Sequence, residues 1–116
     1  MNTQYRIGSI SKTFTAVLIM KAIEDKKLSL NTKLSDFYPE IENANKISIE
    51  QLLQHRTGIH NLTDDKEYWT YNTKPQTESS LISIIKKYKT AFCLRFCIIS
   101  PIFLIVSKVM NSCSML

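Results

Sequence analysis

A serine and a lysine with the spacing of a catalytic pair stand near the start of the chain, as Ser9 and Lys12. Positions i and i+3 of a helix lie on one face, so the hydroxyl and the amine can meet. A serine becomes a good nucleophile when a base takes its proton. A lysine can serve as that base when burial among apolar groups lowers its pKa. The pair therefore predicts nucleophilic catalysis, with Ser9 as the nucleophile and Lys12 as the base.

The pair must be positioned by the run of residues that follows it. This run is largely apolar, and no charged residue follows Lys12 until Lys21. A helix that is apolar on nearly all sides is usually buried. We therefore expect one helix over residues 9–25, with Lys12 at the edge of a core. The residues expected to contact that core are Ala16, Val17, Leu18, Met20, Ala22 and Ile23. The alternative is an ordinary helix start with two small polar residues and a lysine that reaches water.

Two longer segments carry a resemblance to a known family. Residues 5–16 read Tyr-Arg-Ile-Gly-Ser-Ile-Ser-Lys-Thr-Phe-Thr-Ala, and residues 49–59 read Ile-Glu-Gln-Leu-Leu-Gln-His-Arg-Thr-Gly-Ile. Both resemble segments of the penicillin-recognising serine hydrolases, in the branch with class C β-lactamases, DD-peptidases and related esterases. The resemblance covers roughly residues 3–60, and two separated motifs agree in order and spacing.

The resemblance implies an α/β parent fold, with an antiparallel sheet packed against helices. It also implies that Ser9 is acylated while Lys12 assists proton transfer, on a β-lactam, a peptidoglycan peptide or an ester. The present chain carries mainly the helical part of such a fold, so we expect little sheet. The expected helices cover residues 9–25, 48–56 and 79–89.

Local signals define the second and third helices. Ser48 and Gln51 have capping-box spacing, and Gly58 suits the left-handed residue at a helix end. His55 lies near that end, where a structural role is favoured over a catalytic one. Ser79 or Ser80 is expected to cap the third helix. His60 is expected at the surface, and the aromatic group Tyr68, Trp69 and Tyr71 is expected to cover the core rather than line a cleft.

The family's later catalytic elements are missing. The chain contains no Tyr-x-Asn sequence, and Lys89-Thr90-Ala91 lacks the glycine of Lys-Thr-Gly. We therefore predict a fragment, with a partial serine hydrolase domain over 1–89 and an apolar, basic tail over 90–116. Such a fragment is expected to be weakly active or inactive. The alternative function is a small non-enzymatic helical protein that binds a partner or a membrane through its tail.

Charge and cysteine content exclude other classes of function. The net charge of +5 comes from residues 86–116, because residues 1–85 carry ten basic and ten acidic side chains. A basic stripe for nucleic acid is absent. The three cysteines, Cys93, Cys97 and Cys113, have no histidine nearby, so neither a metal nor another cofactor is expected.

The apolar stretch 91–107 contains only 12 uncharged residues in a row, short of the about 20 that span a bilayer. It predicts at most a weak membrane contact. No signal peptide is recognised, so the default location is the cytoplasm, although relatives are commonly exported.

Overall fold

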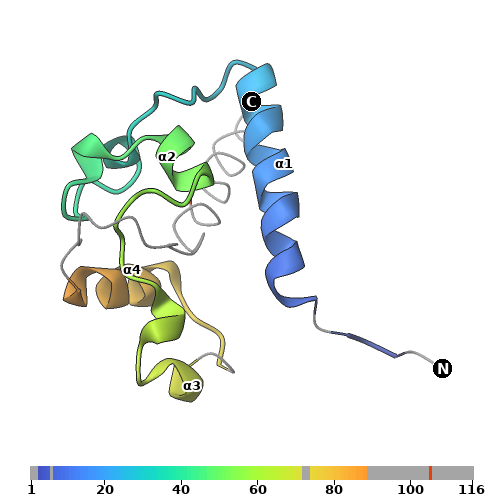
Figure 1. Cartoon of the computed structure of the whole chain (residues 1–116), viewed down its shortest axis with the longest axis vertical. Coiled ribbons are helices and arrows are strands. Elements are labelled where there is room, and N and C mark those ends of the chain that lie inside the picture. The colour runs from blue at the N-terminus through green and yellow to red at the C-terminus, as the bar shows by residue number, and fades with distance from the viewer. Residues whose placement is uncertain (1–2, 6, 72–73, 89–104, 106–116) are drawn as a thin grey trace.

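The computed structural model describes residues 3–5, 7–71, 74–88 and 105. Within these residues the chain is mainly helical and has no strand, apart from one isolated antiparallel bridge between Lys33 and Ser48. In Figure 1, α1 runs along one side of the molecule, while α2, α3 and α4 lie on the other. The α-helices are α1 (Ser11–Glu24), α2 (Ile49–Leu53), α3 (Tyr68–Tyr71) and α4 (Glu78–Lys87). The short 3-10 helices are η1 (Gly8–Ile10), η2 (Leu34–Asp36), η3 (Ala44–Lys46) and η4 (Leu62–Asp64).

Helix α1 forms where the apolar run predicted a helix, but its first turn is the 3-10 helix η1. Its C-terminus closes with Lys26 in the left-handed conformation, at φ 58°. The Lys26 N–H donates to the carbonyl of Ile23, and the Lys27 N–H donates to that of Ala22. These two bonds form a Schellman motif, which satisfies carbonyls that a helix end leaves free.

Helix α2 confirms the predicted capping box. The Ser48 hydroxyl accepts from the backbone N–H of Gln51, and the Gln51 side chain accepts from the N–H of Ser48. The prediction for the other end was wrong, because α2 stops at Leu53 and His55 is the left-handed residue, at φ 59°. A second Schellman motif ends the helix there, before the chain reaches Gly58.

Helix α4 also begins at a different cap from the one expected. Thr77, rather than Ser79 or Ser80, is the N-cap residue, and its hydroxyl accepts from the backbone N–H of Ser80. Thr77 has extended backbone angles, as an N-cap residue requires. Because the cap lies upstream, both serines become part of the first helical turn.

The core joins all the longer segments. Its buried members are mainly aliphatic, and they belong to α1, η2, η3, α2, η4, α4 and the loops between them, together with Ile105. They are Ile19, Leu28, Leu34, Tyr38, Ile41, Ala44, Ile47, Ile49, Leu52, Ile59, Leu62, Ile82, Ile85 and Ile105. Helix α1, which continues the first motif, and the second motif therefore meet in one core, through Ile19 of α1 and Ile49, Leu52 and Ile59 of the second motif.

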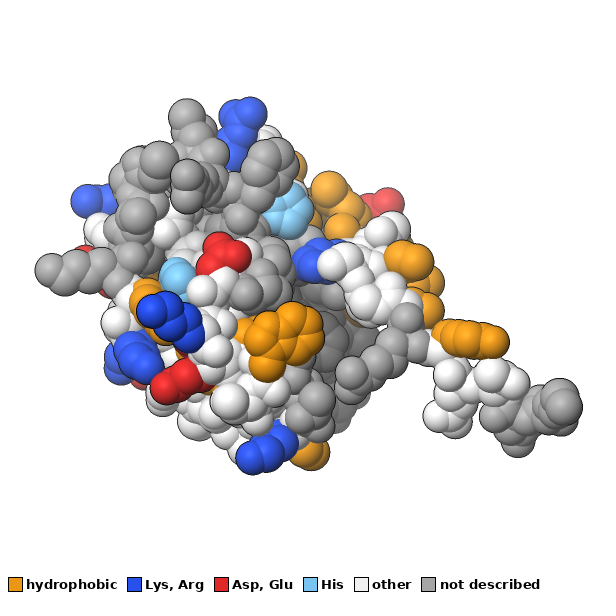
Figure 2. Space-filling view, turned by 60° about the horizontal axis from the view of Figure 1, so that its bottom comes forward, with side chains coloured by type: hydrophobic (Ala, Val, Ile, Leu, Met, Phe, Trp, Pro, Cys, Tyr) orange, Lys and Arg blue, Asp and Glu red, His pale blue; other side chains and the backbone are white. Residues whose placement is uncertain are grey.

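One side of α1 is exposed, which corrects the expectation of a fully buried helix. Ile19 is only 1% exposed, whereas Phe14 and Val17 are 63% and 61% exposed. Leu18 and Met20, which were also expected in the core, are exposed. Figure 2 shows hydrophobic side chains at the surface on the side that carries α1. The apolar run therefore presents one apolar face to the core and a second to the surface.

The predicted tail, residues 90–116, lies outside the described residues except for Ile105, which is fully buried. The three cysteines and the 91–107 stretch therefore stay predictions. Among the helices of the described residues, none combines the length and the apolar character that crossing a membrane requires.

Candidate active site

Ser9 and Lys12 contact one another. The Lys12 Nζ donates a hydrogen bond of 2.7 Å to the Ser9 Oγ. Ser9 is exposed in η1, and Lys12 is half-buried in the first turn of α1. The two side chains that the sequence predicted as a pair are thus within the distance that proton transfer needs.

The backbone before the pair makes a tight turn. The Ile10 N–H donates to the carbonyl of Ile7 at 3.2 Å, so the turn encloses Gly8 and Ser9. The Ser11 N–H then donates to the carbonyls of Gly8 and Ser9. Ser9 is therefore held between two backbone turns, directly ahead of the regular helix that carries Lys12.

The buried face of α1 begins just beyond the pair. Thr15 is buried, and its Oγ1 donates to the carbonyl of Ser11 at 3.2 Å. Ile19 follows one turn later and is a member of the core. The face of α1 that holds Lys12 is thus anchored, while the face that holds Ile10 and Phe14 is exposed.

The two histidines, His55 and His60, are held by contacts in other parts of the chain. The backbone N–H of His55 takes part in the C-terminal motif of α2, in keeping with the structural role expected for this residue. His60, which was expected at the surface, is half-buried, and its ring stacks on Tyr88 with 3.8 Å between the ring centroids. Within the described residues, the Nε2 of His60 is buried without a hydrogen-bond partner.

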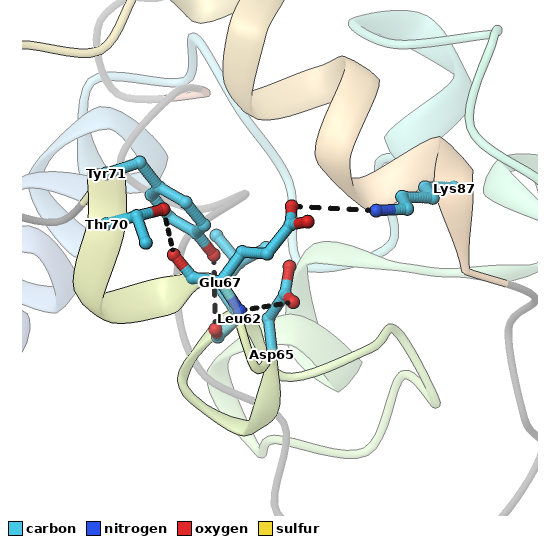
Figure 3. A network of polar contacts seen from close by, with 6 residues as sticks. All are labelled: Leu62, Asp65, Glu67, Thr70, Tyr71 and Lys87. Atoms are coloured by element: carbon cyan, nitrogen blue, oxygen red, sulfur yellow. Dashed lines mark hydrogen bonds and ion pairs between the residues drawn. The ribbon is translucent and has the colours of Figure 1, made fainter.

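The segment that carries Tyr68, Trp69 and Tyr71 is held by hydrogen bonds and an ion pair, shown in Figure 3. The Tyr71 hydroxyl donates to the carbonyl of Leu62 at 3.3 Å. The N–H of Glu67 donates to Asp65, and this bond is the main cause that lowers the pKa of the Asp65 carboxyl. An ion pair of 3.7 Å between Glu67 and Lys87 links the segment to α4.

The expectation that all three aromatic residues cover the core is wrong for one of them. Tyr68 and Tyr71 are half-buried, but Trp69 is 77% exposed. The rings of Tyr68 and Trp69 meet edge to face at 5.3 Å. Trp69 therefore contacts the ring of Tyr68 and does not cover the core.

One further sequence match was missed. Ser29-Leu30-Asn31 has the letters of a Ser-x-Asn element, which the resemblance implies can stand in the place of Tyr-x-Asn. The structure places it beyond the C-terminus of α1, a helix about 21 Å long. The Ser29 Oγ accepts from the N–H of Asn31 at 3.3 Å, so it forms a local turn at the far end of α1 from Ser9.

Comparison with known proteins identifies the family. Residues 1–91 match the Beta-lactamase family, which is more than half of the chain. The chain belongs to the Beta-lactamase family. The match confirms the resemblance carried by the two motifs, because both motifs lie within the matched residues.

Individual relatives of this Beta-lactamase family member are distant. A fimbrial assembly protein FimD, serogroup D, from Dichelobacter nodosus is 29% identical over 90 residues, covering 74% of this chain and 23% of the relative. A teichoic acid D-alanine hydrolase from Staphylococcus aureus is 28% identical over 67 residues, covering 58% of this chain and 17% of the relative. The chain thus spans less than a quarter of the length of these relatives. No solved structure matches it significantly.

Over the described ranges, 3–5, 7–71, 74–88 and 105, no group of three or more His, Cys, Asp or Glu side chains could hold a metal ion.

Proposed function

We propose that this chain carries the nucleophile segment of an acyl-transferring serine hydrolase, with Ser9 as the nucleophile and Lys12 as its base. The observation that carries the proposal is the 2.7 Å contact between Lys12 Nζ and Ser9 Oγ, inside a segment that matches the Beta-lactamase family. Of the two interpretations of the pair, a contacting Ser9 and Lys12 favours catalysis over a lysine that simply extends into water.

The contact suits proton transfer in both directions. The Lys12 amine donates to the Ser9 oxygen at 2.7 Å. Once the amine is neutral, the Ser9 hydroxyl can donate to it along the same line and lose its proton as its oxygen attacks a carbonyl carbon. The protonated amine can then deliver that proton to the leaving group, which leaves an acyl group on Ser9. Water later cleaves this ester and frees the serine.

The substrate we propose is a β-lactam, a peptidoglycan peptide or an ester. The teichoic acid D-alanine hydrolase among the relatives adds D-alanine carried by teichoic acid as a substrate to test. Selectivity among these classes resides in regions of the relatives that this chain does not match.

We propose that residues 1–89 form a partial hydrolase domain, and that the chain as it stands has weak activity or none. Two findings support this. The pair is open to solvent, since Ser9 is exposed and Lys12 is only half-buried, whereas a lysine base needs an apolar, water-poor environment. The chain also lacks Tyr-x-Asn and Lys-Thr-Gly. The resemblance implies that a Lys-Thr-Gly strand helps to form the oxyanion hole, and losing one oxyanion-hole donor costs about 10²–10³ in rate.

A fluorescent phosphonate and a fluorescent penicillin, each followed by mass mapping of peptides, test the proposal on the full chain. We expect slow labelling at Ser9, no labelling of Ser9→Ala, and strongly reduced labelling of Lys12→Ala. Ser11→Ala is the matched control, because Ser11 is an exposed serine two residues away and should leave labelling unchanged. Labelling spread over several serines, or none on a folded chain, would contradict the proposal.

A further inference from the structure

Gly8 stands directly before Ser9 and has a left-handed backbone, with φ +52°. The residues around it are right-handed, with φ −86° at Ile7, −59° at Ile10 and −53° at Ser11. Left-handed angles crowd the Cβ of an L-residue against its own backbone, and glycine has no Cβ. The backbone is therefore left-handed at one residue among right-handed neighbours, immediately before the proposed nucleophile.

Space is not the reason for a glycine at this position. A Cβ built on Gly8 would have no heavy atom within 4 Å, leaving out its two chain neighbours and the backbone of its own helix. A larger side chain would therefore extend into open space. What excludes it is the backbone angle alone.

The angle at Gly8 decides where Ser9 lies. The bond from the Ile10 N–H to the Ile7 carbonyl closes across Gly8 and Ser9, and the Gly8 carbonyl accepts from the Ser11 N–H. If the residue at position 8 relaxed to a negative φ, both bonds would change and the Ser9 side chain would turn relative to Lys12. Lys12 itself stays fixed, because it belongs to the regular part of α1.

We propose that Gly8 is a positioning residue, whose left-handed conformation, rather than its small size, holds Ser9 Oγ against Lys12 Nζ. The inference rests on the proposed roles of Ser9 and Lys12. It makes a prediction that size alone does not, since asparagine is larger than alanine yet adopts left-handed angles more readily.

The experiment compares Gly8→Asn, Gly8→Ala and Gly8→Val in the full chain, with the rate of phosphonate labelling at Ser9 as the first measurement. We expect the order Gly, Asn, Ala, Val. The losses for Ala and Val should be about tenfold or more, the factor that corresponds to the left-handed penalty of an L-residue. A requirement for small size would instead place Ala above Asn, and that order would overturn the inference.

A second measurement does not depend on activity. The Lys12 side-chain NMR resonance is recorded with and without Ser9→Ala in each background. The change in its chemical shift caused by Ser9→Ala should be large in the natural chain, smaller in the Gly8→Asn background and lost in the Gly8→Ala background. If wild-type Ser9 is not labelled, the proposed function fails while this response still decides the role of Gly8. An equal response in every background would overturn the inference, and circular dichroism confirms that each variant contains the helix.

Discussion

The Tyr38 hydroxyl donates a hydrogen bond of 2.8 Å to the Glu78 carboxylate, joining residues 40 positions apart in the chain. Tyr38 is 1% exposed and lies just after η2, whereas Glu78 is the first residue of α4. The bond therefore fastens α4 to the part of the core that precedes α2. Burial is the main cause that raises the pKa of Tyr38, and the bond to Glu78 adds to it.

Replacing Tyr38 by phenylalanine should lower the free energy of unfolding by about 1 kcal/mol, the usual contribution of one hydrogen bond. The loss stays moderate because Glu78 is exposed and can bind water instead. Urea denaturation at neutral pH measures it. Tyr5→Phe is the control, because Tyr5 is 84% exposed. An equal loss in both variants would show that the Tyr38 bond does not contribute.

The same pair predicts a pH dependence at the alkaline end. An unfolded tyrosine loses its proton near pH 10, and the folded pKa of Tyr38 is higher. Above about pH 10 the unfolded chain has therefore lost more protons than the folded chain, and the free energy of unfolding falls as the pH rises. Below that pH the contribution of Tyr38 is complete. In Tyr38→Phe the alkaline fall should be shallower, although Tyr71 and Tyr88, whose pKa values are also raised, keep part of it. An unchanged slope would contradict the assignment.

The two faces of α1 should respond differently to the same kind of truncation. Ile19→Ala removes a fully buried side chain and should destabilise the fold by about 2–5 kcal/mol. Val17→Ala removes exposed methyl groups two residues earlier and should change stability by less than about 0.5 kcal/mol. Thermal or urea unfolding of both variants checks this, and similar losses would mean that the outer face is covered in solution.

The cap of α4 offers a third comparison. Thr77→Ala should cost about 1 kcal/mol, because the N–H of Ser80 loses its acceptor. Ser79→Ala should cost little, since Ser79 is an exposed residue of the first turn, and alanine has the higher helix propensity. The reverse order of stabilities would restore the original expectation of a serine cap.

The left-handed residue at the end of α1 predicts a stabilising change. Lys26→Gly removes the crowding of a Cβ at φ 58°, and should raise the free energy of unfolding by about 0.5–1 kcal/mol after the entropy cost of glycine. Lys27→Gly changes the next residue, which has no positive φ, and should destabilise the fold. Equilibrium unfolding of the two variants tests the pair, and stabilisation of both would point to a cause other than backbone angle.

Local features could be predicted from the sequence because their physics acts within one or two helical turns. Ser9 and Lys12 meet since i and i+3 share a helix face, and the capping box of Ser48 and Gln51 forms from residues three apart. The family resemblance of the two motifs also needed only the order of residues. These inferences gave the mainly helical character, the positions of three helices and the candidate catalytic pair.

Tertiary structure decided what periodicity leaves open. The run after Lys12 is apolar nearly all round, so nothing in it distinguishes the face of Ile19, which belongs to the core, from the exposed face of Val17. Helix α2 ends at Leu53 with the left-handed residue at His55, although Gly58 also has a left-handed backbone at φ 70°, so glycine preference alone does not reveal where the helix ends. The contact of Tyr38 with Glu78 joins distant segments, and such a contact exists only once the intervening chain has folded.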